Sequence, residues 1–154
     1  PNFICLVPEN RKEITTEGGL NLSKNKLIIK KIISKFKRKK IRTSLFIDPN
    51  LKDIKIAKDL NVDCVELHTG KISNLIKQKR SFILEYKKIK KCCEFANKIG
   101  LEVHAGHGLD YKSTKILTKI KEIKEFNIGH FIIGESLFLG LKNIIKKFKK
   151  ISNN

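Results

Sequence analysis

Two glycine-histidine loops carry the side chains with the clearest chemical potential. In Leu101–Tyr111, with the sequence LEVHAGHGLDY, Gly106 and Gly108 flank His107. Glycines on both sides let the backbone approach a ligand closely while the imidazole is presented to it. A second pair, Gly129–His130, follows a later apolar run and precedes a helical pattern. Since glycine amides at the start of a helix bind anions, we interpret the two loops as a phosphate-binding mouth with a histidine over it.

Strands and helices that alternate along the chain must position these loops. Apolar runs predict buried strands, and apolar residues three or four positions apart predict helices between them. Five such alternations indicate an α/β protein with parallel strands. The strands are expected at Asn2–Pro8, Ile41–Asp48, Val62–Leu67, Leu101–Ala105 and Glu125–Ile128. The helices are expected at Lys26–Lys40, Leu51–Leu60, Ser81–Ile99, Ser113–Ile120 and Ile132–Ile151.

Polar side chains gather where these strands end. In a (β/α)₈ barrel that end is the active-site face, and the loops after the last two strands commonly hold phosphate. Because both glycine-histidine loops follow the last two strands, we favour an incomplete (β/α)₈ TIM barrel over an open doubly wound sheet. It would have about five β/α units, too few to close a barrel, and form a single domain over residues 1–154. The polar residues at or just past strand ends are Glu9, Asp48, Glu66, His68, His104, His107 and His130.

A large positive charge is the strongest feature of the composition. The formal net charge is +19, which favours nucleic acid or acidic membranes through long-range attraction. Only four of the 34 basic residues are arginine, however, and base recognition relies on the bidentate guanidinium group. We therefore interpret most lysines as solvated surface and expect neither a specific nucleic acid partner nor a membrane. A Lys-rich module that binds RNA or another polyanion stays as the alternative.

The cysteines and the hydropathy bear on the compartment. Cys5 and Cys64 lie in apolar runs, Cys92 and Cys93 are adjacent on an expected helix, and no CxxC spacing occurs. This pattern argues against a zinc site or a disulfide framework and favours a reducing compartment. The sequence contains neither a signal-peptide pattern nor a run of about 20 apolar residues that could span a membrane. We expect a cytoplasmic protein without a metal site.

Five motifs, in this order, carry a resemblance to a known family: LVPENRKEITTEGGL (6–20), SLFIDP (44–49), VELHTG (65–70), VHAGHGLDY (103–111) and FNIGHFIIG (126–134). Together they resemble pyridoxine 5′-phosphate synthase of the deoxyxylulose-dependent vitamin B6 pathway, over the whole chain to about Lys150. The resemblance implies a (β/α)₈ barrel that forms homo-oligomers. It also implies condensation of 1-deoxy-D-xylulose 5-phosphate with 3-amino-2-oxopropyl phosphate to pyridoxine 5′-phosphate, phosphate and water, without a metal or organic cofactor.

The same resemblance implies roles for individual residues. His107 matches the family's catalytic acid, and Glu66 matches a carboxylate that stabilises the transition state. Histidine suits this chemistry because ring closure by dehydration needs a group that gives and takes protons near neutral pH. Glu66 also lies in an otherwise apolar strand, where an unpaired carboxylate is costly to bury. The substrate and phosphate contacts implied by the resemblance are Thr15, Gly108, Gly129 and His130.

The family's chains open with strands that have no counterpart among these 154 residues. Those strands carry an Asn-x-Asp-His motif, a catalytic histidine and a catalytic glutamate, and Glu9 matches none of them. A barrel typically has about 250 residues, so this chain corresponds to roughly the last two thirds of one. Each lost proton-transfer group costs about 10²–10⁴-fold in rate. We expect the family's function for the parent protein and little or no turnover for these residues alone; a decayed, non-catalytic remnant is a further alternative.

Overall fold

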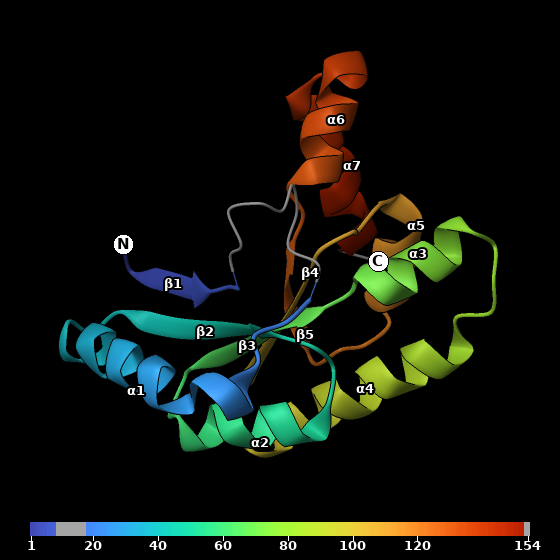
Figure 1. Ribbon diagram of the computed structural model, residues 1–154. Helices are drawn as coiled ribbons and strands as arrows, with labels where there is room; N and C mark the ends of the chain where they lie inside the picture. Colours follow the sequence, from blue (N-terminus) through green and yellow to red (C-terminus); the bar gives the residue numbers. More distant parts are fainter. Residues whose placement is uncertain (9–17, 153–154) are drawn as a thin grey trace.

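The computed structural model describes residues 1–8 and 18–152, and Figure 1 shows strands that alternate with helices, as the sequence predicts. The strands are β1 (Phe3–Leu6), β2 (Arg42–Ile47), β3 (Cys64–His68), β4 (Glu102–Gly106) and β5 (Ile123–Asn127). The helices are α1 (Leu22–Arg38), α2 (Leu51–Asp59), α3 (Gly70–Lys77), α4 (Ile83–Lys98), α5 (Tyr111–Leu117), α6 (His130–Leu139) and α7 (Leu141–Ser152).

The five strands lie side by side in chain order, and every neighbouring pair is parallel. A doubly wound sheet reverses its strand order at a switch point, whereas a (β/α)₈ barrel adds each strand beside the previous one. The predicted α/β class is therefore confirmed, and the sheet is consistent with an incomplete barrel. Within the described residues, β1 and β5 each have one neighbouring strand and form the two edges of the sheet.

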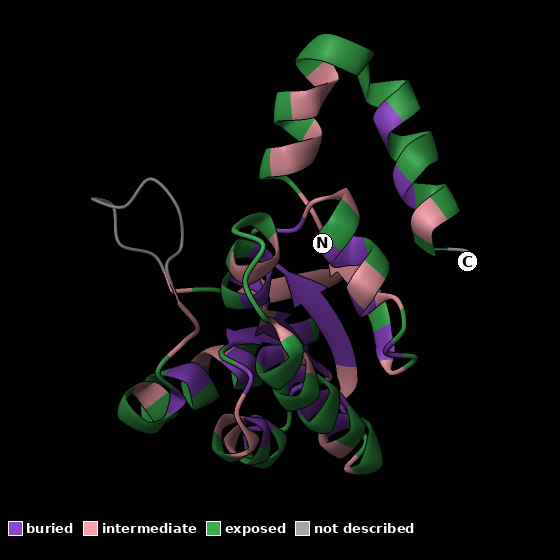
Figure 2. Ribbon diagram, turned by 90° about the vertical axis from the view of Figure 1, so that its right-hand side faces the viewer, coloured by how far each residue is buried: buried purple, intermediate pink, exposed green. Residues whose placement is uncertain are grey.

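One face of the sheet is apolar and covered by helices. The side chains of Leu45, Val65 and Val103 are fully buried there, in one core cluster with Ile54 of α2 and Ile89 of α4. In Figure 1, α1, α2 and α4 run along this side of the sheet. Figure 2 shows the buried residues concentrated between these helices and the strands. The hydrophobic core thus lies on one side of the sheet only.

The opposite face of the sheet carries polar side chains. Successive side chains of a strand point to opposite faces, and the parallel register aligns equivalent positions of neighbouring strands. Two rows across the sheet follow from the pairing: Phe46, Glu66, His104 and Glu125 form one, and His68, Gly106 and Asn127 form the next. A doubly wound sheet is covered by helices on both faces and would need an apolar surface here, which these polar rows do not provide.

Helix α1 starts earlier than predicted, α2 starts at the predicted residue, and α3 was not predicted. Helix α1 begins at Leu22, four residues before the predicted start, because Asn21 caps it by accepting a hydrogen bond from the backbone N–H of Lys24. Helix α2 begins at Leu51, and the side chain of Asn50 caps it by accepting a hydrogen bond from the backbone N–H of Asp53. Helix α3 was not predicted at all, since eight residues give too short an apolar pattern.

The single helix predicted over Ile132–Ile151 is wrong, because the chain breaks there into two helices. Gly140 has a φ of 76°, a left-handed conformation that ends α6 and lets α7 turn back against it (Figure 1). Helix α7 buries Ile144 and Phe148, whereas no residue of α6 is buried. Although α6 is strongly apolar it has only ten residues, and no helix in residues 18–152 is long and apolar enough to cross a membrane.

The core on the helical face predicts a contrast between two isoleucines of α1. Ile33 is 2% exposed and Ile28 is 62% exposed. Ile33→Ala should lower the free energy of unfolding by about 2–5 kcal/mol, because it removes buried methyl groups and leaves a cavity. Ile28→Ala should change it by no more than about 0.5 kcal/mol. Urea denaturation of both variants measures the difference, and equal losses would contradict the assigned core.

Candidate active site

A cavity of about 560 Å³ lies at the carboxyl ends of the strands, between the loops that follow β4 and β5. Its wall includes Val7 after β1, Phe46 of β2 and residues of α3. The sixth residue predicted from the sequence, Thr15, lies outside the described residues. The structure brings the other five into this one cavity: Glu66, His107, Gly108, Gly129 and His130.

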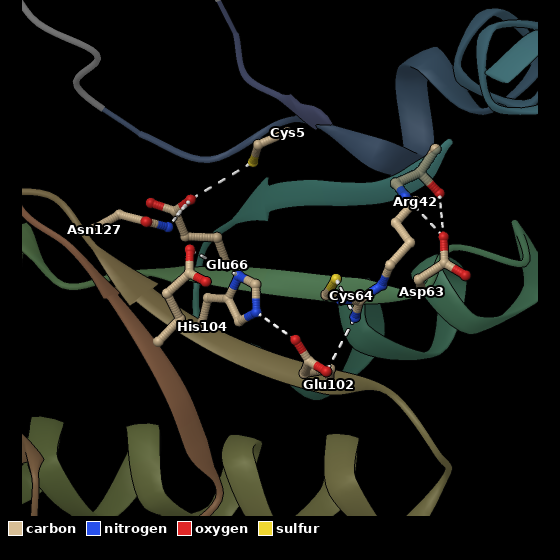
Figure 3. Close-up of polar contacts among 10 residues, drawn as sticks. Cys5, Arg42, Asp63, Cys64, Glu66, Glu102, His104 and Asn127 are labelled. Carbon is tan, nitrogen blue, oxygen red and sulfur yellow. Dashed lines mark hydrogen bonds and ion pairs between the residues drawn. The ribbon is translucent and has the colours of Figure 1, made fainter. Parts of the chain in front are cut away.

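The carboxylate of Glu66 is held on the polar face of the sheet. Figure 3 shows it between Asn127 of β5 and Cys5 of β1. The Nδ2 of Asn127 donates a hydrogen bond of 2.8 Å to Oε2, and the thiol of Cys5 contacts the same oxygen at 3.6 Å. Burial, together with the nearby carboxylate, raises the pKa of the Cys5 thiol to about 12, so the thiol keeps its proton and can donate it to this contact. Side chains from the two edge strands, β1 and β5, thus orient one carboxylate on the central strand β3.

Burial also sets the protonation behaviour of Glu66. The residue is 9% exposed, and removal from water raises the pKa of its carboxyl, while the hydrogen bonds from Asn127 and Cys5 act in the opposite direction. A carboxyl with a raised pKa can exchange a proton closer to neutral pH than an ordinary glutamate. Glu66 therefore has the environment of a functional carboxylate and not of a surface one.

A glycine in the neighbouring strand makes room for this carboxylate. Gly106 of β4 lies beside it, and a Cβ added there would come within contact distance of Glu66 Oε1 and 3.2 Å from the Cβ of Asn127. Its φ lies outside the left-handed region, so the backbone itself does not require glycine at this position. The first glycine of the AGHG motif thus serves Glu66, which the sequence pattern did not reveal.

The imidazole of His107 lies half-buried at the wall of the cavity. Its backbone has a φ of 77°, a conformation that non-glycine residues rarely adopt. Burial and the proximity of His130 lower the pKa of His107. The lowered pKa favours the neutral imidazole near pH 7, and a negative charge beside the ring would favour its protonated form.

The amino terminus of α6 lies at the cavity and gives that part of its wall a partial positive charge. Gly129 occupies the N-cap position, and His130 is the first residue of this ten-residue helix. Unpaired backbone N–H groups of the first turn attract anions, and a Cβ added at Gly129 would meet nothing within 4 Å, so a ligand can reach the backbone. Gly108 and Lys77 also line the cavity. Both glycine loops for which the sequence predicts phosphate binding therefore border the same cavity.

Two other histidines have different surroundings. The ring of His68 packs against the ring of His107, with centroids 4.8 Å apart. The Nδ1 of His68 is 3.3 Å from Asp48 Oδ1. Asp48 also accepts a hydrogen bond from the backbone N–H of Gly19. His104, which the sequence placed near a strand end, lies within β4 and is 2% exposed.

A second polar cluster lies at the opposite ends of the strands, and Figure 3 shows it around the guanidinium of Arg42. Ligand atoms of Cys64, Glu102 and His104 lie within 4.8 Å of one another, a spacing that could hold a metal ion. The guanidinium of Arg42, however, donates to Glu102 at 3.0 Å and lies 3.8 Å from Cys64 Sγ. Burial raises the pKa of the Cys64 thiol to about 11, which leaves it neutral. The cation that fits this cluster is therefore the arginine itself.

Sequence reasoning missed Asn127, which holds Glu66. The alternation of side chains along the expected strand could have indicated it, since Asn127 lies two residues before Gly129. The pairing of β4 with β5 places Asn127 on the same face of the sheet as Gly106. The register between β4 and β5 could not be read from the sequence, and the pairing shifts between Val103 and His104. Without that register no pattern joins an asparagine of one strand to a glutamate two strands away.

The buried carboxylate predicts that Glu66→Gln stabilises the full-length protein near pH 8. Because the pKa of Glu66 is raised in the folded state, its ionisation opposes folding as the pH rises from the unfolded pKa toward the folded one. The amide keeps an acceptor for Asn127 and carries no charge. The gain should be present at pH 8 and vanish below about pH 4, where the carboxyl is protonated in both states. Urea denaturation at both pH values measures it.

Glu102→Gln is the matched control for this prediction. The hydrogen bond from His104 and the contact with Arg42 lower the pKa of Glu102, so its ionised form supports folding. This variant should lose stability at pH 8, the opposite sign. If Glu66→Gln also destabilises the protein at pH 8, the assigned environment of Glu66 is wrong.

Comparison with known proteins identifies the family. The family model described as "Pyridoxal phosphate biosynthesis protein PdxJ" matches residues 1–154. Three relatives named pyridoxine 5′-phosphate synthase come from Pelagibacter ubique, Sulfurihydrogenibium sp. and Blochmanniella floridana. They are 74%, 44% and 42% identical over 99%, 100% and 98% of this chain. The match covers 64%, 63% and 61% of the relatives, so the chain spans less than two thirds of their length. The chain belongs to the PdxJ family of pyridoxal phosphate biosynthesis proteins.

Proposed function

We propose that the protein containing this chain is a pyridoxine 5′-phosphate synthase, the name carried by its relatives. It would condense 1-deoxy-D-xylulose 5-phosphate with 3-amino-2-oxopropyl phosphate and release phosphate and water. The observation that supports this most is the convergence of an imidazole, a buried carboxylate and a helix amino terminus on one cavity. Those are the groups that proton transfer on a phosphorylated substrate requires.

In this proposal each end of the cavity has its own task. The phosphate of one substrate binds the backbone amides at Gly108 and Gly129, beside His130. Its negative charge opposes the effects that lower the pKa of His107, so that bound substrate favours the protonated imidazole. His107 then donates that proton to a departing hydroxyl during dehydration. Glu66 faces the reacting carbon skeleton and stabilises positive charge that develops on the nitrogen.

The remaining features of the proposal concern cofactors, assembly and compartment. We propose that the reaction needs no metal or organic cofactor, and that the protein forms homo-oligomers in the cytoplasm. Support for a reducing compartment comes from four free cysteines, three of them buried: Cys5, Cys64, Cys92 and Cys93. Thr15 is proposed to contact substrate. Small phosphorylated molecules are the proposed partners, and a specific nucleic acid or a membrane is not.

The proposal predicts that His107→Gln removes most turnover from the full-length protein. Loss of a positioned proton donor should lower kcat by about 10²–10⁴-fold, while KM changes less because the glycine loops still bind phosphate. Steady-state kinetics with both substrates measures the effect, with the remote and exposed Ile28→Ala as the control. A His107→Gln variant with kcat within threefold of the parent would contradict the assigned role. Salt-sensitive RNA binding that survives His107→Gln and Gly108→Ala would favour the polyanion-binding alternative.

The chain of 154 residues should itself show little or no turnover. It spans less than two thirds of its relatives, and two edge strands, β1 and β5, each have one neighbour in its described part. We expect the purified chain to be at least about 10²-fold slower than the full-length protein, as loss of further proton-transfer groups requires. Side-by-side kinetics tests this, and equal turnover would show that these residues suffice.

A further inference from the structure

The HTG turn consists of His68, the last residue of β3, Thr69, and Gly70, the first residue of α3. It contacts the backbone of His107. Thr69 is fully buried. Its Oγ1 lies 2.7 Å from the carbonyl oxygen of Gly106 and 2.8 Å from that of His107, so the hydroxyl proton is shared between two acceptors. The backbone N–H of Thr69 donates to the same Gly106 oxygen at 2.8 Å. One residue thus makes three polar contacts to the turn that presents His107.

The local helix does not account for these contacts. Thr69 occupies the N-cap position of α3, where a threonine hydroxyl ordinarily accepts a hydrogen bond from a backbone N–H of its own helix. That capping bond is absent in α3. A residue that forgoes a local stabilising bond for a distant one indicates a constraint from elsewhere in the fold, and here the distant partner is the His107 turn.

The conformation of His107 explains what the contacts do. A positive φ is an unfavourable backbone conformation for a non-glycine residue, and it persists where surrounding contacts hold it. His107 has a φ of 77°, and Gly108 follows with a φ of 71°. Thr69 binds the carbonyl oxygens of Gly106 and His107, which belong to the peptide units before and after the Cα of His107. The hydroxyl therefore fixes the strained peptide units directly.

The other two residues of the HTG turn, His68 and Gly70, constrain the position of the His107 ring. A Cβ added to Gly70 would lie 2.9 Å from His68 Nε2 and 3.0 Å from His107 Cδ2, so the two rings can pack closely only because residue 70 is glycine. Asp48 holds the far side of His68 at 3.3 Å. Backbone and ring of His107 are thus each constrained by the same three-residue turn.

We infer that Thr69 is a positioning residue, whose hydroxyl holds the Gly106–His107 backbone in the conformation that directs the His107 imidazole into the cavity. This inference rests on the proposed function of His107. It extends that proposal, because neither the glycine-histidine motif nor the cavity lining includes Thr69. The role of the HTG turn is therefore to place the catalytic acid, and Gly70 supports it by leaving room for the ring.

Two substitutions in the full-length protein separate the hydroxyl from the shape of the side chain. Thr69→Val keeps the volume and removes the hydroxyl, and it should lower kcat by about 10–100-fold with KM within threefold, as a displaced catalytic group does. Thr69→Ser keeps the hydroxyl and should retain kcat within about threefold. Equal kcat for Thr69→Val and the parent, or equal loss in both variants, would overturn the inference.

A readout without turnover keeps the inference distinguishable from the proposed function. In NMR spectra of the ring protons, Thr69→Val should shift the signals of His107 and change their titration midpoint, whereas Thr69→Ser should not. Unchanged His107 signals in Thr69→Val would overturn the positioning role even if His107→Gln abolishes activity. Conversely, shifted signals together with an active His107→Gln variant would leave the positioning intact and refute the catalytic role.

A third variant covers the case in which Thr69→Val does not fold. Gly70→Ala places a methyl group against the His68 and His107 rings, and it should produce the same loss of kcat at nearly constant KM. Gly134→Ala in α6, where an added Cβ meets nothing within 4 Å, is the matched glycine control and should keep full activity. Full activity in Gly70→Ala would overturn the inference that the HTG turn places the ring.

Discussion

The site depends on the parallel register of β3, β4 and β5. In that register Glu66 lies opposite His104, and Gly106 lies opposite Asn127 one row further toward the mouth. Since side chains alternate between faces, a slip of one residue in any of these pairs would exchange the polar interior for the apolar core. The buried leucines and valines of the helical face therefore fix the register, and the register in turn places the carboxylate beside its amide donor. The same strand register therefore determines both the packing of the core and the geometry of the site.

Two glycines show how closely this arrangement is fitted. Gly106 leaves the space that Glu66 Oε1 occupies, and Gly70 leaves the space between the rings of His68 and His107. Neither has a left-handed backbone, so both are explained by what lies beside them and not by a turn. The left-handed conformation falls instead on His107, where a glycine would adopt it at lower cost. The chain thus accepts backbone strain in exchange for an imidazole at that position, which is the pattern of a functional site.

The α/β fold class could be predicted from the sequence because it depends on local patterns, and five of the six residues named as site candidates line one cavity. Apolar runs mark strands, and glycine-histidine pairs mark loops at their ends. Asn127 and Thr69 could not be predicted in this way, because their partners lie two strands away or 37 and 38 residues along the chain. Thr69 also stands at a helix start, where capping is the ordinary explanation for a threonine. The break at Gly140 was missed because the apolar spacing continues through it.

The two ends of the polar face differ in how completely their charges are paired. At the amino ends of the strands, Glu102 bridges Arg42 at 3.0 Å and His104 at 2.8 Å, and Glu125 lies 3.9 Å from His104. Each charge there has a partner, as a structural network requires. At the mouth, within residues 18–152, neither His107 nor His130 forms an ion pair, and each glycine loop leaves backbone exposed to the cavity. Water satisfies the free N–H groups of an accessible helix amino terminus, and an anionic ligand can replace that water. The asymmetry between the two ends supports the proposal that chemistry takes place at the mouth, while the paired charges at the opposite end contribute to stability.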